Sequence, residues 1–358
     1  MPGSPVTGHD KASNDRLSLQ QPNGAPGPVP APAEGLALAP PSPAERWARA
    51  RTFHHSSYSV ARVAGDRAER GLRVSVCLPA RECAGTVGEI VATLGELQTA
   101  GAIDAIVVVD AASQDGTATV AEREGAVVWQ EAELMPSHGA VLGKGDAMWR
   151  ALSVLEGEVV CFLDADTEGF SEHFLTGLLG PLLCEPGVSF VKAFYRRPLI
   201  HGVSGQPLRG PAGAPGATPG ADGGGRVNHL LARPALELFY PQLAGVRQPL
   251  AGEVAARREL LERLPFATGY GVEIAMLIDV WREVGLDGIA QVDLEEHRNR
   301  HQALSALTPM ALTVLATIAG RLEREGRLSP PAAAGELDNG AATHAPLERP
   351  PFASVRVA

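Results

Sequence analysis

The sequence predicts an α/β protein built on a doubly wound, mostly parallel β-sheet with helices on both faces. Three observations support this fold class. Short apolar runs of strand length alternate along the chain with segments of helical periodicity. The runs are apolar at successive positions, as in parallel strands that are buried on both faces. Several runs end in polar clusters, and ligands of such sheets bind beyond the carboxyl ends of the strands.

The predicted elements follow one another in a regular order. Strands are predicted at residues 74–78, 105–109, 126–129, 159–163, 188–194 and 289–292. Helices are predicted after Thr86 and at residues 146–155 and 272–284. Thr86 and Glu89 have the spacing of a capping box, in which both side chains bond free N–H groups at the helix start. This order supports the doubly wound sheet.

The composition divides the 358 residues into a core and three loose segments. Residues 1–45 hold ten of the 29 prolines and no hydrophobic periodicity, which predicts a disordered N-terminal tail. Residues 201–222 are rich in glycine and proline and predict a flexible insertion. Residues 328–358 predict a disordered C-terminal tail. The core therefore consists of two parts, residues 46–200 and residues 223–327.

The charge and the cysteines limit the partners and the compartment. Lys and Arg number 31 against 41 Asp and Glu, and a net charge of -10 excludes a duplex nucleic-acid binder. The four cysteines form no C-x-x-C pair, so neither a disulfide framework nor a cysteine zinc site is expected. The first twenty residues lack an apolar stretch, and the run at 307–319 contains Pro309 and is too short to span a bilayer. We expect a cytoplasmic protein without a membrane partner.

Asp164-Ala-Asp166 is the most informative motif, because it directly follows a predicted strand. Residues i and i+2 of an extended segment point the same way, so both carboxylates leave the strand tip together. A hard divalent cation with oxygen ligands would relieve their repulsion. The alternative is an acidic turn in which Asp166 caps a helix. The position at a strand end of an alternating α/β chain favours the metal.

Five further polar clusters each allow a functional and a structural interpretation. They are residues 110–117, 143–146, 223–228, 269–273 and 297–300. Lys144 suits a diphosphate, and Arg226 beside consecutive glycine N–H groups suits an anion. The structural alternatives are a solvated helix entry at Lys144, turn chemistry at 110–117, the frayed end of the insertion at 223–228, a carboxylate at a helix start for Glu273 and a structural role for His297.

Taken together and in order, these stretches resemble the glucosyl-3-phosphoglycerate synthases, nucleotide-sugar glycosyltransferases with the GT-A fold. The resemblance spans about residues 47–322. It rests on the D-x-D motif and on Lys-Gly-Asp-Ala-Met-Trp (144–149), Phe-Tyr-Arg-Arg-Pro-Leu (194–199), Gly-Gly-Gly-Arg-Val (223–227), Leu-Pro-Phe-Ala (264–267), Gly-Tyr-Gly-Val-Glu-Ile (269–274) and His-Arg-Asn-Arg (297–300).

The resemblance implies several sets of site residues. Donor contacts would come from Pro79, Ala80, Arg81, Glu82, Cys83, Ser113, Lys144, Asp164, Ala165, Tyr270, Gly271, Val272 and Glu273. The acceptor would be bound by Gly225, Arg226, Val227, Asn228, Asn299 and Arg300. The metal ligands would be Asp166 and His297, and the residues with a part in the chemistry would be Asp166, Lys144 and Glu273.

The resemblance also implies an activity. A retaining enzyme would move glucose from a nucleotide-glucose, with UDP-glucose expected, to the 2-hydroxyl of 3-phosphoglycerate, as in methylglucose lipopolysaccharide or glucosylglycerate synthesis. The metal would be Mg²⁺ or Mn²⁺, and an imidazole ligand favours Mn²⁺. Residues 46–200 would form the nucleotide-sugar half of a GT-A-like fold, residues 223–327 would bind the acceptor, and the enzyme would be a homodimer.

Three alternatives and three departures accompany this interpretation. The alternatives are a mannosyl-type synthase with another sugar or acceptor, a sugar nucleotidyltransferase, and a non-catalytic nucleotide-sugar-binding protein. A nucleotidyltransferase is expected to carry a glycine-rich, arginine-containing loop after its first strand, which residues 79–85 do not resemble. Among the departures from the family, Glu82 lies one position early, Asn228 replaces a threonine, and Glu295 stands where a basic residue is common.

Overall fold

The structure is a computed structural model that describes residues 40–197, 225–298, 304–329 and 347–355. The predicted insertion at 201–222 lies outside the described residues, and so do residues 1–39 of the predicted N-terminal tail. The remainder of that tail is not loose, because helix α1 (Pro43–Ala50) begins within it. Ser42 and Glu45 form a capping box at its start, which the search for hydrophobic periodicity did not detect.

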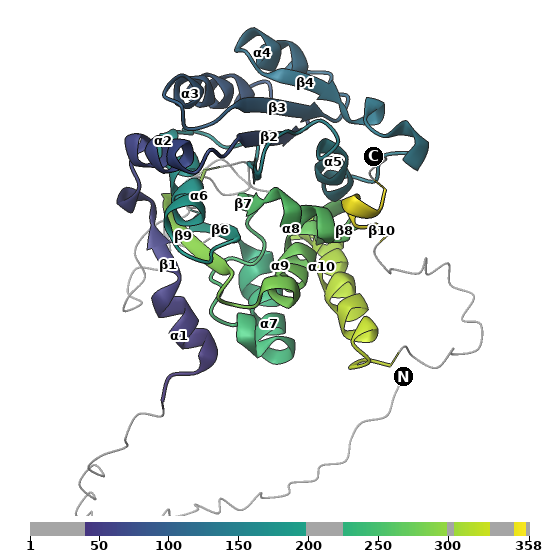
Figure 1. The fold of residues 1–358 in the computed structure, drawn as a ribbon. Helices are drawn as coiled ribbons and strands as arrows, with labels where there is room; N and C mark the ends of the chain where they lie inside the picture. Colours follow the sequence, from purple (N-terminus) through teal and green to yellow (C-terminus); the bar gives the residue numbers. More distant parts are fainter. Residues whose placement is uncertain (1–39, 198–224, 299–303, 330–346, 356–358) are drawn as a thin grey trace, which may run out of the picture. The chain divides into compact units, whose positions relative to one another are not determined.

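An eight-stranded sheet forms the centre of the protein, in the order β1-β9-β6-β7-β5-β2-β3-β4 (Figure 1). Its strands are β1 (Thr52–His54), β2 (Val74–Ala80), β3 (Ala105–Asp110), β4 (Val127–Gln130), β5 (Val159–Phe162), β6 (Phe190–Arg196), β7 (Val254–Arg257) and β9 (Ile289–Glu296). Strand β7 is antiparallel to both neighbours, and the other described pairings are parallel. The predicted mostly parallel sheet is confirmed. The start of β7 lies at the edge where the other strands end.

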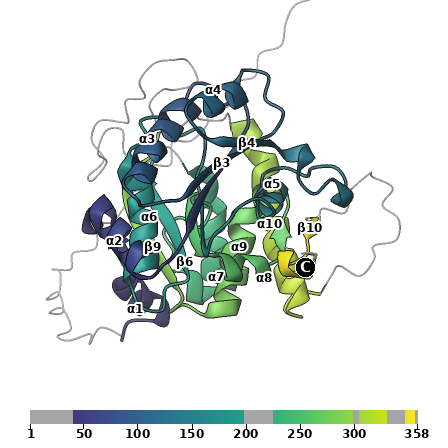
Figure 2. The same cartoon turned by 45° about the horizontal axis from the view of Figure 1, so that its top comes forward.

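Helices cover both faces of the sheet, as predicted. One face packs against α2 (Val60–Glu69), α3 (Val87–Thr99), α4 (Thr117–Arg123) and α6 (Glu172–Cys184). The other face packs against α1, α5 (Lys144–Ala151), α7 (Arg233–Phe239), α8 (Arg258–Arg263), α9 (Val272–Val284) and α10 (Leu304–Arg324). Figure 2 shows α3 beside α4 over their face. Side chains alternate between the two cores within a strand, since Val76 and Leu78 join the first and Cys77 the second.

The two predicted halves do not form separate units. The described residues from Pro41 onward make one compact body. Strand β7 of the second half lies between β5 and β6 of the first, and β9 pairs with β6 on its other side. The division at 200 and 223 follows the insertion in the sequence, whereas the sheet is continuous across it.

The predicted capping box at Thr86 is wrong. Thr86 is the N-cap of α3, but its side chain makes no capping hydrogen bond. Its hydroxyl donates instead to the Ala165 carbonyl at 2.6 Å and to the Cys83 carbonyl at 3.2 Å. The Thr86 hydroxyl therefore bonds a carbonyl that is distant in the sequence, and it does not cap the helix as the local pattern predicted. The result is a direct tie between the start of α3 and the D-x-D motif.

Helix α10 is longer than the apolar run at 307–319 indicated. It has 21 residues and is long and apolar enough, by length and composition alone, to cross a membrane. Its second half packs inside this protein, where Val314 and Ile318 are buried. Arg321 is also fully buried and pairs with Asp279 of α9. This half therefore serves as a core helix in the structure.

The predicted C-terminal tail is wrong at residues 347–355, here named the C-terminal strap. Its strand β10 (Glu348–Arg349) pairs antiparallel with β8 (Phe266–Ala267). Arg349 donates to both carboxylate oxygens of Asp146, each at 2.6 Å. Phe352 is buried against Trp149, with ring centroids 5.9 Å apart. Figures 1 and 2 both show this yellow segment beside α5 and α10. The five prolines of residues 328–358 indicated a loose segment and hid this docked piece.

We predict that the strap stabilises the whole body. Phe352→Ala removes a ring that is 3% exposed and should lower the free energy of unfolding by about 3–5 kcal/mol. Leu347→Ala is the control, because Leu347 is 64% exposed in the same segment and should have little effect. Denaturant unfolding measures both. Equal stabilities of Phe352→Ala and the unchanged protein would mean that the strap is not docked in solution.

Candidate functional site

Lys144 is the centre of the candidate site. Its Nζ lies 2.6 Å from Oδ1 of Asp164 at the end of β5 and 3.1 Å from Oε1 of Glu273 in the first turn of α9. Burial alone would lower the pKa of Lys144, but the two carboxylates outweigh this effect and raise it. The lysine is thus a fixed positive charge. The interpretation of Lys144 as a solvated lysine at a helix entry is wrong.

Glycine is required on each side of Lys144 for a different structural reason. Gly143 adopts φ 90°, a left-handed conformation that favours glycine, and α5 begins at the next residue. A Cβ atom at Gly145 would collide with the carbonyl oxygen of Ala267. The glycine therefore lets the start of α5 approach the segment that leads to Glu273. Lys144 reaches both carboxylates because of this close approach.

A second pair of ionisable side chains lies in the buried part of the site. His297, directly after β9, places Nε2 2.9 Å from Oε1 of Glu253 and 3.0 Å from the hydroxyl of Thr167. Tyr195 stacks on the imidazole at 4.4 Å between ring centroids and donates its hydroxyl to Glu253 at 2.8 Å. Burial opposes ionisation of Glu253, yet His297 and its other partners hold the pKa of this carboxyl well below its usual range. Glu253 is therefore an anion in the core.

Asp166 is a largely buried carboxylate whose environment disfavours its charge. Burial and the nearby Asp164 carboxylate raise the pKa of Asp166, against the opposing effects of His297 and Lys144. The Asp164 carboxylate lies against Gly252, where a Cβ atom would overlap both of its oxygens. Both aspartates of the motif thus face a region with excess negative charge. The interpretation of Asp166 as a helix cap has no support in the described residues, because no helix that the structure describes has Asp166 as its N-cap.

These donors fit a divalent cation. Asp164, Glu253 and His297 each offer a ligand atom, and these atoms all lie within 4.8 Å of one another. His297 Nδ1 is buried and has no hydrogen-bond partner among the described residues. Carboxylates with one imidazole suit Mg²⁺ or Mn²⁺, and the imidazole favours Mn²⁺. Asp166 and His297 stay the predicted ligands, and the structure adds Asp164 and Glu253 as candidates.

The predicted donor loop at Pro79–Cys83 is tied to the loop after β3. The backbone N–H of Glu82 donates to the Ser113 hydroxyl at 2.8 Å, and Oε1 of Glu82 accepts from the N–H of Gln114 at 2.9 Å. The N–H of Cys83 donates to the Thr117 hydroxyl at 2.8 Å. Glu82 adopts φ 53°, so its early position in the sequence corresponds to a left-handed turn that returns its carboxylate to the neighbouring loop. These hydrogen bonds hold the two loops together.

The other predicted residues fall into two groups. Among the donor candidates, Ala80 and Ala165 are buried at strand ends, Arg81 is exposed, and Gly271 and Val272 are buried where α9 starts. Tyr270 is 52% exposed in the same turn.

The described acceptor candidates lie at the start of a helical segment. Gly225 adopts φ 70°, and Arg226 and Val227 lead into the π-helix η4 (Asn228–Ala232). The carboxamide oxygen of Asn228 accepts from the N–H of Leu250 at 3.0 Å, so this side chain supports the segment before Glu253. Asn299 and Arg300 lie outside the described residues.

Sequence reasoning missed Glu253, Thr167 and Tyr195 as part of this site. Glu253 precedes β7, and neither a predicted strand end nor a glycine-rich helix start marks its position in the sequence. Because β7 is antiparallel, its first residues lie at the same edge as those ends. A signal was present in the chain, since Glu253 is one charged residue within the apolar segment 249–256. A buried glutamate in such a segment requires a charged or hydrogen-bonding partner.

Comparisons with known proteins find similar sequences over most of the chain. Residues 75–199 match the family described as glycosyl transferase family 2. The glucosyl-3-phosphoglycerate synthase of Petrotoga mobilis is 38% identical over 281 residues, which cover 78% of this chain and 82% of that protein. The enzyme of the same name from Mycolicibacterium smegmatis is 41% identical over 276 residues, 77% of this chain and 86% of that one.

Two solved structures are similar over most of the chain. The mannosyl-3-phosphoglycerate synthase of Rubrobacter xylanophilus has 43% identity and a TM-score of 0.77, covering 87% of this chain and 99% of that one. The glucosyl-3-phosphoglycerate synthase of Mycobacterium tuberculosis, in complex with Mn²⁺, UDP-glucose and phosphoglyceric acid, has 34% identity and a TM-score of 0.70. That match covers 86% of this chain and 99% of the other.

We predict that Glu253 contributes to cation affinity. Glu253→Gln keeps the shape but removes the negative charge beside His297, and it should weaken Mn²⁺ binding by about 10- to 100-fold. Titration followed by electron paramagnetic resonance measures free Mn²⁺ directly. Glu259→Gln, an exposed position on α8, is the matched control. An Mn²⁺ affinity in Glu253→Gln equal to that of the control would restrict Glu253 to supporting Tyr195 and His297.

Proposed function

The chain belongs to the glucosyl-3-phosphoglycerate synthases, and from this premise we propose that it transfers glucose from UDP-glucose to 3-phosphoglycerate. It is a hexosyltransferase of the GT-A-like α/β fold, and a relative at 34% identity binds Mn²⁺, UDP-glucose and phosphoglyceric acid together. The observation that carries the proposal is the meeting of Asp164, Lys144, Glu253 and His297 at one edge of the sheet. This arrangement provides a cation site beside a fixed positive charge.

The residues divide the work of the transfer. A bound Mn²⁺ or Mg²⁺ would act as a Lewis acid on the leaving diphosphate. We assign the binding of this metal ion to Asp166 and His297, supported by Asp164 and Glu253. Lys144 supplies a second positive charge that is already oriented by two carboxylates, so it needs no reorganisation as charge develops on the diphosphate.

Glu273 has a separate role in the proposal. Its carboxylate lies at the start of α9 and pairs with Lys144. We assign to it the orientation of the sugar, whose anomeric carbon becomes positively charged during transfer. The proposed course is retention of the α-anomer, with the 2-hydroxyl of the acceptor as the attacking group.

The acceptor is assigned to the segment that begins at Gly225. A left-handed glycine before a helical start presents backbone N–H groups to an anion, and the Arg226 guanidinium can form a paired contact with phosphate oxygens. Asn228 links this segment to Leu250, three residues before Glu253. Acceptor phosphate and metal would therefore lie on connected elements.

A mannosyl donor is the second candidate. The Rubrobacter xylanophilus structure is that of a mannosyl-3-phosphoglycerate synthase, and its 43% identity exceeds the 34% of the Mycobacterium tuberculosis complex. The donor contacts that we assign include many backbone groups, which distinguish sugars and bases poorly. We place glucose first because the curated relatives at 38% and 41% identity are glucosyl enzymes.

The proposed reaction predicts a specific pattern of product release. Purified protein with Mn²⁺, UDP-glucose and 3-phosphoglycerate should release UDP, and omission of any one component should stop the release. GDP-mannose in place of UDP-glucose tests the second candidate in the same assay. Release of nucleoside diphosphate only with GDP-mannose would make the protein a mannosyl enzyme.

Arg226→Ala tests the assignment of the acceptor site. Loss of one charge-assisted contact costs about 1.5–3 kcal/mol, which corresponds to roughly ten- to a hundredfold in kcat/KM for 3-phosphoglycerate. UDP-glucose binding should change little. Loss of donor affinity with an unchanged acceptor KM would transfer Arg226 to the donor site.

We further propose a cytoplasmic homodimer. The four cysteines are unpaired, which agrees with a reducing compartment. Helix α10 exposes Leu304, Leu312 and Leu315 by 66%, 44% and 44%, on a different side of the helix from the buried Val314 and Ile318. An exposed apolar strip of this kind suits a second copy of the chain.

The dimer proposal predicts the effect of charge on this strip. Leu312→Glu combined with Leu315→Glu should produce monomers in size-exclusion chromatography with light scattering, because two buried carboxylates at an interface are costly. Leu238→Glu on α7, which is 72% exposed, is the matched control and should stay dimeric. A monomer without any substitution would refute the proposal.

A further inference from the structure

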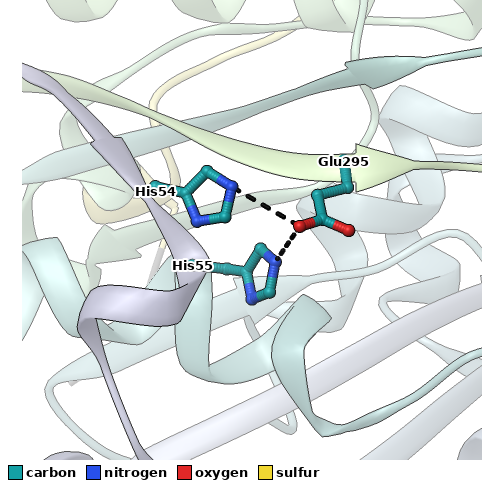
Figure 3. Close-up of side chains that lie close together, drawn as sticks. All are labelled: His54, His55 and Glu295. Atoms are coloured by element: carbon teal, nitrogen blue, oxygen red, sulfur yellow. Dashed lines mark ion pairs between the residues drawn. The ribbon is translucent and has the colours of Figure 1, made fainter.

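A second group of potential metal ligands lies where β1 and β9 end. The two strands are parallel neighbours, with His54 opposite Asp293. His54 ends β1, His55 opens the following turn η1 (His55–Ser57), and Glu295 lies near the end of β9. Figure 3 shows both imidazoles directed at the Glu295 carboxylate. Oε1 of Glu295 lies 3.6 Å from Nε2 of His54 and 3.2 Å from Nε2 of His55.

These spacings match those of a metal site. Zinc binds histidine nitrogen and carboxylate oxygen at about 2.0–2.1 Å in tetrahedral geometry, which separates neighbouring ligand atoms by about 3.3 Å. The two measured separations lie on either side of that value, and all three ligand atoms lie within 4.8 Å of one another. An ion could therefore bind with small adjustments of the side chains.

The backbone of β9 directs Glu295 toward the histidines. Glu295 adopts φ 64°, a left-handed conformation that is uncommon for residues other than glycine. The pairing of β6 with β9 also shifts here, since Phe194 pairs with Asp293 but Arg196 pairs with Glu296. Such a bulge redirects a side chain. The backbone N–H of Glu295 donates to Asp293 Oδ1 at 2.9 Å and holds this conformation.

Neighbouring groups orient the two imidazoles. The Ser56 hydroxyl lies 2.8 Å from Nδ1 of His54 and can accept the proton that a metal-bound imidazole carries there. In the structure this nitrogen accepts from the Ser56 N–H at 3.2 Å, and a metal on Nε2 would exchange this hydrogen bond for one donated to the Ser56 hydroxyl. Nε2 of His55 is buried and has no aligned hydrogen-bond partner among the described residues.

His173 packs against the His55 ring. The His55 ring packs between the rings of His54 and His173, with 4.5 Å between centroids on each side. The nitrogens of His173 already contact the Ser171 hydroxyl at 2.6 Å and the Leu294 carbonyl at 3.2 Å. It therefore acts as a packing partner and not as a ligand.

We propose that His54, His55 and Glu295 form a binding site for a zinc-class divalent cation, separate from the cation site at Asp164, Asp166, Glu253 and His297. Two imidazoles and one carboxylate suit Zn²⁺ and Co²⁺, whereas the carboxylate-rich set suits Mg²⁺ and Mn²⁺. The side chains of His54 and Glu295 are 44% and 57% exposed, which leaves access for the ion and for water as a further ligand. This proposal does not depend on the proposed function.

A bound ion would connect two elements of the sheet. It would link the end of β1 to β9 at a position two residues before His297. The backbone of Arg298 in turn forms an isolated antiparallel β-bridge with Glu168, two residues after the D-x-D motif. Binding should therefore stabilise the folded state by mass action, and it should be measurable without any assay of activity.

The test is Co²⁺ and Zn²⁺ binding to the full-length, untagged chain. With Mg²⁺ in excess, Co²⁺ should give the visible absorption of a four- or five-coordinate site, and Zn²⁺ should raise the melting temperature. Glu295→Gln and His54→Gln should each weaken Zn²⁺ binding at least about tenfold. Asp166→Asn, which alters the other site, should keep the Co²⁺ spectrum.

His229→Gln is the matched control, because His229 is an exposed histidine outside the cluster and its loss should change nothing. Unchanged Zn²⁺ affinity in both Glu295→Gln and His54→Gln would overturn the proposal and restrict the cluster to surface ion pairs. A Co²⁺ spectrum that disappears in Asp166→Asn but persists in Glu295→Gln would also overturn it. If Glu295→Gln fails to fold, His54→Gln decides, since His54 is partly exposed.

Discussion

The buried negative charge at one edge of the sheet is the constraint on which the site depends. Asp164, Asp166, Glu253 and Glu273 meet there, and the positive charge of Lys144 balances only part of their charge. Buried carboxylates are costly unless they are paired. This edge of the sheet therefore needs cationic side chains such as Lys144, and it favours a bound metal ion in addition. The same excess of charge that costs stability suits a divalent ion.

Keeping these carboxylates together places demands on distant parts of the chain. Gly145 allows α5 to approach Ala267, and Gly252 leaves room for the Asp164 carboxylate. The C-terminal strap then holds α5 from outside through the bonds of Arg349 to Asp146. Arg349 thus binds the helix that carries Lys144 from more than 200 positions away in the sequence. The rigidity of the site comes from these contacts between elements and not from any single loop.

The ends of β1 and β9, at the same edge of the sheet, show how similar residue types suit a different chemistry. At the main site, carboxylates dominate and the ions that fit are hard. At His54, His55 and Glu295, imidazoles dominate and the cluster lies near the surface. Glu295, which departs from the basic residue common in the family, has its partners on β1.

The sequence by itself determined the alternation of strands and helices, the D-x-D motif at a strand end and the glycines around Lys144, because these depend on local periodicity and backbone conformation. It also carried the ordered motifs of the family. Only the tertiary structure decided that Glu253 faces His297, that Thr86 bonds Ala165 instead of its own helix, and that residues 347–355 are docked. Each depends on a partner far away in the chain, and strand direction at β7 has no local signal. Long-range pairing decides which side chains meet, and local patterns cannot specify it.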